Sequence, residues 1–98
     1  MADEDKERAA YRALVDRVLT SDGRASAEQR ARAFGNGLAP PLDALIDKVA
    51  NRPAQVTDAD FAAAKASGFG EDQLFELVIC AAVGQSTRLY EAGLAALA

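Results

Sequence analysis

The residues that could do chemistry gather in the last third of the chain. Glu76 lies in the middle of an apolar stretch, where a carboxylate must find a partner or change its pKa. It could act as a general acid or base in a pocket, form a salt bridge to another helix, or face solvent at an edge. We favour the two structural roles, a salt bridge or a solvent-facing edge position, over the catalytic one, and keep Glu76 as the candidate catalytic residue. The basic residues that could reach it from the first helix are Lys6, Arg8, Arg12 and Arg17.

Three polar residues follow Glu76 at helical spacing and form a candidate ligand-binding set. Gln85, Arg88 and Tyr90 could surround the carboxylate of a small ligand in a pocket. The alternative for Arg88 is a surface ion pair with Glu91, three residues further on, which is the usual fate of such a pair on a helix.

The single cysteine, Cys80, is predicted to be buried core. A reactive thiol needs a lowered pKa from a cation, a helix N-terminus or a second thiol. Cys80 lies about two turns into its predicted helix, and the charge of Glu76, four residues earlier, would raise its pKa. One cysteine forms no internal disulfide, which is typical of a reducing compartment, so we predict a cytoplasmic protein.

Composition argues against several classes of function. With no histidine and one cysteine, the ligand sets of zinc and copper sites are missing, and we predict neither a metal nor a cofactor. The net charge is −4, and Arg24, Arg30 and Arg32 are read as a solvated helix face, so no nucleic-acid partner is expected. No apolar run approaches the roughly 18–20 residues of a membrane span, so no membrane partner is expected.

The elements that must position these residues are helices. A chain of 98 residues makes one domain, residues 1–98, and we predict an all-α fold, a compact bundle of about five helices. Apolar periodicity, capping residues, prolines and glycines place these helices at about 3–20, 26–34, 41–52, 57–67 and 71–97. On the first, one amphipathic face is formed by Tyr11, Leu14, Val15, Val18 and Leu19.

The last predicted helix is too long for a compact domain of this size. About 27 residues span roughly 40 Å, whereas the domain diameter should be about 30–35 Å. The helix therefore either breaks or projects, and we predict a kink near Gly84, because glycine weakens a helix interior. Its surface is apolar all round, which predicts a homodimer or higher oligomer formed through this C-terminal helix.

The stretch TDADFAAAKASGFGEDQLFELVICAAVG resembles the carboxymuconolactone decarboxylase and alkylhydroperoxidase-D-like family, over about residues 41 to 85. The resemblance implies an all-helical, oligomeric protein. Family peroxidases carry Cys-x-x-Cys and a histidine, whose places here fall near Pro53, Val56 and Asp60. The resemblance therefore implies a fold and an assembly habit without the redox site. The residues that fit the family pattern are Ala66, Gly68, Glu71, Glu76, Leu77, Ala81 and Ala82.

These observations favour a non-catalytic helical protein that acts in assembly, as an accessory, or by binding a small ligand. The first alternative is an enzyme of the carboxymuconolactone decarboxylase-like class, with Glu76 as acid or base and Arg88 or Tyr90 orienting the substrate. The second is a regulator that binds a partner protein through an exposed apolar patch. The expected partners are a second copy of the chain, a small ligand or another protein.

Overall fold

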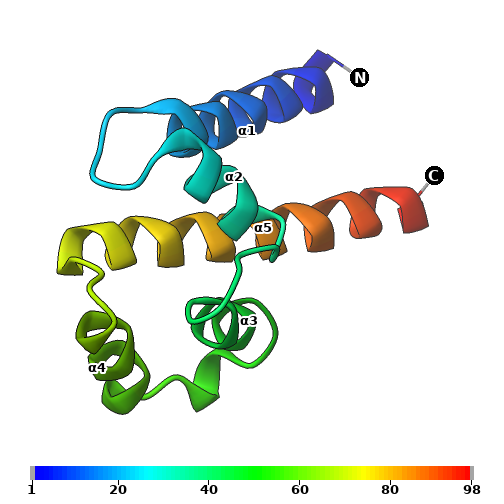
Figure 1. Cartoon of the computed structure of the whole chain (residues 1–98). Coiled ribbons are helices and arrows are strands. Elements are labelled where there is room, and N and C mark those ends of the chain that lie inside the picture. Colours follow the sequence, from blue (N-terminus) through cyan, green and yellow to red (C-terminus); the bar gives the residue numbers. More distant parts are fainter. Residues whose placement is uncertain (1, 98) are drawn as a thin grey trace.

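The longest helix, α5 (Glu71–Leu97), forms the axis on which the other helices pack (Figure 1). The computed structural model describes the backbone of residues 2–97 and the side chains of residues 5–97. Within residues 2–97 the chain forms five α-helices and one 3₁₀ turn, and no strand. The prediction of an all-α bundle with a long C-terminal helix is therefore confirmed.

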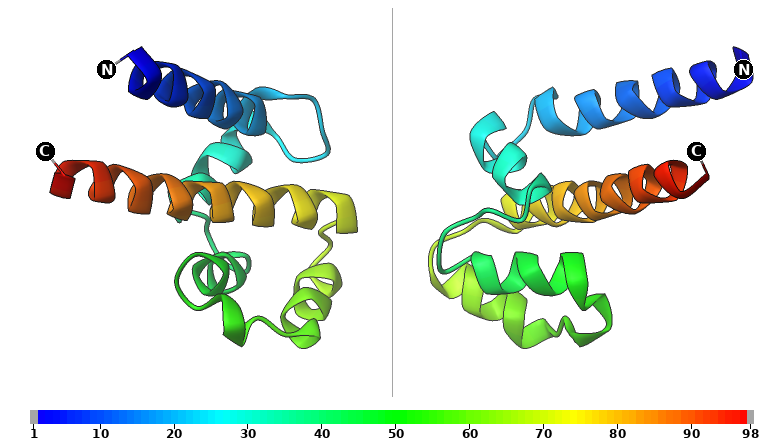
Figure 2. Two further views of the ribbon diagram at one scale, coloured as in Figure 1. Left: turned by 180° about the vertical axis from the view of Figure 1, so that it is seen from behind. Right: turned by 90° about the vertical axis from the view of Figure 1, so that its right-hand side faces the viewer.

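The remaining elements lie on two sides of α5 (Figures 1 and 2). On one side are α1 (Ala2–Thr20) and α2 (Ala27–Phe34), and on the other are α3 (Asp43–Asn51), the turn η1 (Pro53–Gln55) and α4 (Asp58–Ala66). None of the helices in residues 2–97 is both long enough and apolar enough to cross a membrane.

Local signals in the sequence set most of the helix boundaries. Ser26 and Gln29 form a reciprocal capping box at the start of α2, and Thr57 and Asp60 form another at the start of α4. After α4 the backbone of Gly68 adopts a φ of 100°, a conformation that side chains disfavour. These local interactions set where α2 begins and where α4 begins and ends.

Small side chains let α2 approach α5 closely, and α3 packs on α5 through larger ones. Ala33 of α2 and Ala81 of α5 are fully buried, as is Leu77 beside them. Ile46 of α3 and Leu74 of α5 complete the centre of the core with 1% and 2% of their surfaces exposed. Because alanine fills little space, this core depends on short distances between helices rather than on large side chains.

The predicted kink near Gly84 is wrong, because α5 is continuous from Glu71 to Leu97 and shows no bend in the ribbon views (Figures 1 and 2). Gly84 is buried, and a Cβ added there would collide with the backbone carbonyl of Phe34 at the end of α2. The glycine serves close helix packing instead of a break. The helix therefore projects, and the longest dimension of the molecule is 49 Å.

The expected amphipathic face of the first helix is only partly covered. Val15, Val18 and Leu19 are half-buried, whereas Leu14 keeps 48% of its surface exposed. Of this face, only Val18 packs against the buried core. The first helix is thus attached along one edge.

Candidate functional site

Glu76 is the centre of a polar cluster that joins the loop between α1 and α2 to α5. Its carboxylate accepts hydrogen bonds from the backbone amides of Arg24 at 3.0 Å and Ala25 at 2.7 Å. The guanidinium of Arg30, on α2, lies 3.3 Å from the same carboxylate. That guanidinium also donates to the carbonyl oxygen of Ser21. This polar cluster therefore joins the loop, α2 and α5 at one point.

The partner of Glu76 differs from the expected one. A salt bridge to another helix is present, but it comes from Arg30 of α2 instead of a basic residue of α1. The interpretation of Arg30 as part of a solvated face is wrong, because only 3% of this residue is exposed. Gly23 leaves the necessary room, since a Cβ there would overlap both charged groups.

The surroundings of Glu76 favour its ionised form. The amide of Ala25 contributes most to lowering the pKa of the Glu76 carboxyl, and the amide of Arg24 and the charge of Arg30 act in the same direction against the effect of burial. A carboxylate held by three donors is a hydrogen-bond acceptor with its geometry fixed.

Cys80 lies one turn beyond Glu76 on α5 and is 1% exposed, which confirms the prediction of a buried thiol. Its Sγ lies 3.8 Å from the carbonyl oxygen of Val18. Burial, above all, raises the pKa of this thiol, and the positive charge of Arg30 only partly opposes it. Cys80 therefore fills space where α1 meets α5.

Two of the three predicted ligand-binding residues lie together at the end of α2. Arg88 donates from Nη1 to the carbonyl oxygen of Phe34 at 2.8 Å, and from Nε and Nη2 to Oε1 of Gln85 at 3.1 and 3.0 Å. It thereby satisfies a terminal carbonyl of α2, a group that has no partner within the helix. The expected ion pair between Arg88 and Glu91 is replaced by these contacts.

Tyr90, the third predicted residue, lies against α1 rather than beside the Arg88 guanidinium. Its ring stacks on that of Tyr11 at a centroid distance of 4.9 Å. The Tyr11 hydroxyl is 2.8 Å from Oγ1 of Thr87. These contacts join the second half of α5 to α1.

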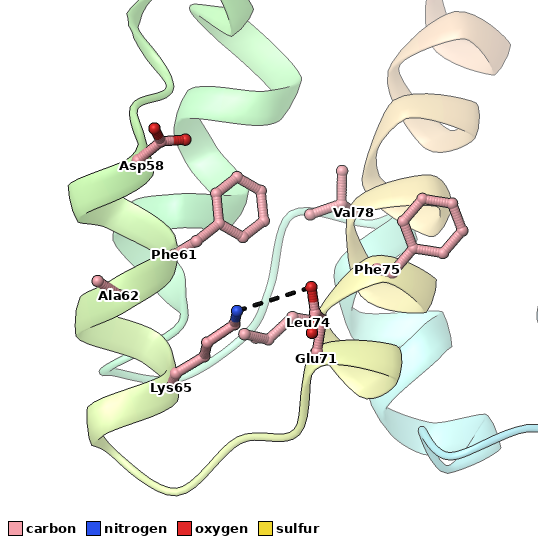
Figure 3. Close-up of a pocket in the computed structure, with 8 residues that line it drawn as sticks. All are labelled: Asp58, Phe61, Ala62, Lys65, Glu71, Leu74, Phe75 and Val78. Carbon is pink, nitrogen blue, oxygen red and sulfur yellow. Dashed lines mark ion pairs between the residues drawn. The ribbon is translucent and has the colours of Figure 1, made fainter.

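An apolar pocket of about 460 Å³ lies between α4 and α5 (Figure 3). Phe61 from α4 and Val78 from α5 point toward each other across it, and Leu74 and Phe75 complete its apolar wall (Figure 3). At one edge, Lys65 of α4 and Glu71 of α5 form an ion pair at 3.7 Å. The sequence does not predict this pocket, because it forms only where α4 is placed against α5.

The face of α5 that points away from α2 is an exposed seam. Its members recur at alternating steps of four and three residues, the spacing by which one helix packs on another. Phe75 and Leu89 each keep 64% of their surface exposed, and Ile79 keeps 37%. Seen from behind, α5 has no other element in front of it (Figure 2). The outer seam, as we name this face, consists of Phe75, Ile79, Ala82, Ser86, Leu89, Gly93 and Ala96.

Comparison with known proteins returns no match to a family model, a curated protein or a solved structure. Within the described residues, no three acidic or cysteine side chains gather closely enough to hold a metal ion.

Proposed function

We propose that this chain is a non-catalytic assembly module that forms a homodimer through the outer seam of α5. The observation that supports the proposal is the exposure of Phe75, Ile79 and Leu89 on one uncovered helix face. The seam bears no charged side chain from Phe75 to Ala96. A contiguous apolar surface of this kind marks an interaction site on a small protein.

The size of the chain supports the same proposal. A domain of about 100 residues buries only about two-thirds of its unfolded surface, so covering an exposed helix face adds substantially to its stability. The resemblance to the alkylhydroperoxidase-D-like family, with its oligomeric habit, points the same way. The single, buried thiol of Cys80 fits our proposal that the module works in the cytoplasm.

The contacts of the polar residues give less support to the enzyme alternative. Glu76 already accepts from two amides and pairs with Arg30, so its oxygens have structural partners. Arg88 and Gln85 are engaged at the end of α2, away from the tyrosine pair. An acid or base needs a free site for a reacting proton, and these groups are used in holding the fold.

Small-ligand binding is a second candidate function, favoured by the pocket between α4 and α5. A volume of about 460 Å³ suits a small molecule, and the apolar wall with one ion pair at its edge suits an apolar or amphipathic one. This candidate differs from self-association in one respect, because a ligand pocket can be filled in a monomer.

Light scattering of matched variants tests the assembly proposal. At micromolar concentration the wild type should show at least twice the 10.3 kDa mass of the chain. Leu89→Glu places a charge on the outer seam and should give the monomer mass, because a charge is costly to bury in such an interface. Ala63→Glu adds the same charge at an exposed position of α4 and should leave the dimer intact. A wild type that stays monomeric at high concentration would contradict the proposal and favour a ligand or a different protein partner.

A further inference from the structure

We infer that the pocket between α4 and α5 binds an amphipathic organic cation, with the apolar body of the ligand between the two helices and its ammonium group at Asp58. This inference rests on small-ligand binding, the second candidate function, and names the class of ligand. Three features distinguish a cationic ligand from an anionic or neutral one: the shape of the pocket, the partners of its charged groups, and the aromatic ring beside Asp58.

The pocket is formed by one face of each helix, and its two ends differ. On both α4 and α5 the lining residues follow one another at steps of three, one and three positions, the spacing that brings side chains to one face of a helix. Lys65 and Glu71 lie at the end next to the turn that joins the helices, and Asp58 lies at the opposite end (Figure 3). Between the ends the wall is apolar, over a volume of about 460 Å³. A ligand that fits is therefore apolar along its length and carries its charged group at one end.

The charged groups of the pocket leave one negative charge without a partner. Lys65 and Glu71 form an ion pair with each other at 3.7 Å, so their charges compensate. Asp58 forms no ion pair and accepts no hydrogen bond among the residues whose side chains the structure describes. The capping of α4 is the task of Asp60, two residues later, which also pairs with Lys48 at 2.9 Å. The carboxylate of Asp58 is therefore available to a cation.

An anionic ligand would meet an unfavourable charge at either end of the pocket. At one end it would have to displace Glu71 from Lys65, and at the other it would face Asp58. A cation at the Asp58 end meets a favourable charge. The Phe61 ring lies beside that carboxylate, three residues further along α4 (Figure 3). Because the face of an aromatic ring attracts a cation, the carboxylate and the ring together favour an ammonium group at this end.

Three probes that differ only in their end group test this preference. Phenylbutylamine, phenylbutanol and phenylvalerate carry a phenyl ring on the same butyl chain, which ends at neutral pH in an ammonium, a hydroxyl or a carboxylate. NMR titration of the wild-type chain measures each dissociation constant and locates binding through the signals of Phe61 and Val78. The ammonium probe should bind with a dissociation constant on the order of 1 mM, about fivefold below that of the alcohol, because one partly exposed charge pair contributes about this factor. The carboxylate should bind more weakly than the alcohol.

A matched pair of variants tests the role of Asp58. Asp58→Asn should raise the dissociation constant of the ammonium probe about fivefold and leave that of the alcohol unchanged. Asp43→Asn is the control, because Asp43 is the first residue of α3 as Asp58 is the first of α4, and it lies outside the pocket. This control should change neither dissociation constant, although both substitutions remove an acidic group from the start of a helix.

The outcomes separate this inference from both candidate functions. Tighter binding of the ammonium probe at Phe61 and Val78, with a preference that Asp58→Asn removes, supports the inference. Equal binding of the three probes, or tightest binding of the carboxylate, overturns the inference and leaves small-ligand binding standing. An ammonium preference that survives in Asp58→Asn overturns the role of Asp58. Signals of the pocket that move with none of the probes overturn the inference and small-ligand binding of this kind together. The assembly proposal depends on none of these results, because the mass of the chain in solution tests it.

Discussion

The two halves of α5 both carry large apolar residues but lie in different surroundings. In the first half, residues 71–84, Leu77 and Cys80 are buried against the other helices, and Glu76 holds the loop between α1 and α2. In the second half, residues 85–97, Leu89 and Leu97 are exposed. The difference shows that apolar content alone does not identify the core of this chain. The close approach of α2, made possible by small residues, decides which half is covered.

We expect the largest effect on stability from disrupting the polar cluster around Glu76 in the first half. Glu76→Ala leaves the Arg30 cation almost fully buried without its carboxylate, which should lower the free energy of unfolding by about 3 kcal/mol. We place the loss at the lower end for such pairs because 24% of the Glu76 side chain is exposed. Urea unfolding followed by circular dichroism measures it, and Glu91→Ala in the second half is the matched control.

The stability of Glu76→Ala should also depend less on pH than that of the wild type. The pKa of Glu76 is lowered in the folded chain, so its stabilising contribution is fully present above the ordinary carboxyl pKa of 4.5 and is lost as the pH falls through the lower folded value. Glu76→Ala should therefore show a weaker loss of stability on acidification than the wild type. A residual slope should remain, because the pKa values of Asp47 and Asp60 are also lowered. Identical slopes in the two proteins would contradict this role of Glu76.

A pair of glycine substitutions compares the two halves directly. Gly84→Ala places a Cβ against the Phe34 carbonyl and should cost about 2 kcal/mol of unfolding free energy. Gly93→Ala meets no atom within 4 Å and should stabilise the helix by about 0.5–1 kcal/mol. Both are measured in a Leu89→Glu background, where association should not contribute. Effects of the same sign would show that the two halves are packed alike.

Much of the fold follows from local sequence signals, and much of the site depends on tertiary placement. The capping residues Ser26 and Thr57 predicted two helix starts correctly because capping is a local interaction. The sequence does not reveal the role of Gly84, because a glycine that weakens a helix and one that admits a neighbouring backbone look the same in sequence. The three-residue spacing of Arg30 and Ala33 places them on one face of α2, but the sequence does not show that this face is the buried one.

The partners of the polar residues on α5 show the same limit. The apolar surroundings of Glu76 predicted either a salt bridge or a solvent-facing edge position, because a carboxylate is costly to bury unpaired, and the salt bridge is the one present. It did not predict the amides of Arg24 and Ala25, since a loop folded against a distant helix has no periodic pattern. The large seam residues Phe75, Ile79 and Leu89 are visible in the sequence as apolar positions, but their exposure depends on which side α2 and α3 occupy.

The smallest effect is expected where the second half of α5 meets α1. Tyr11→Phe removes a hydroxyl that lies 2.8 Å from Thr87 and keeps the ring that stacks on Tyr90. The Thr87 hydroxyl donates to the carbonyl oxygen of Val83, so it retains a partner, and the Tyr11 hydroxyl is the donor that is lost. In a part-buried position such a hydrogen bond contributes about 0.5 kcal/mol, and the Leu89→Glu background again keeps association out of the measurement.

Native-state hydrogen exchange measures the local stability of the two halves. Amides of residues 85–97 should exchange faster than those of residues 71–84 in the Leu89→Glu background, because fewer buried contacts hold them. A loss above about 2 kcal/mol, or equal protection of the two halves, would mean that the second half belongs to the core as firmly as the first.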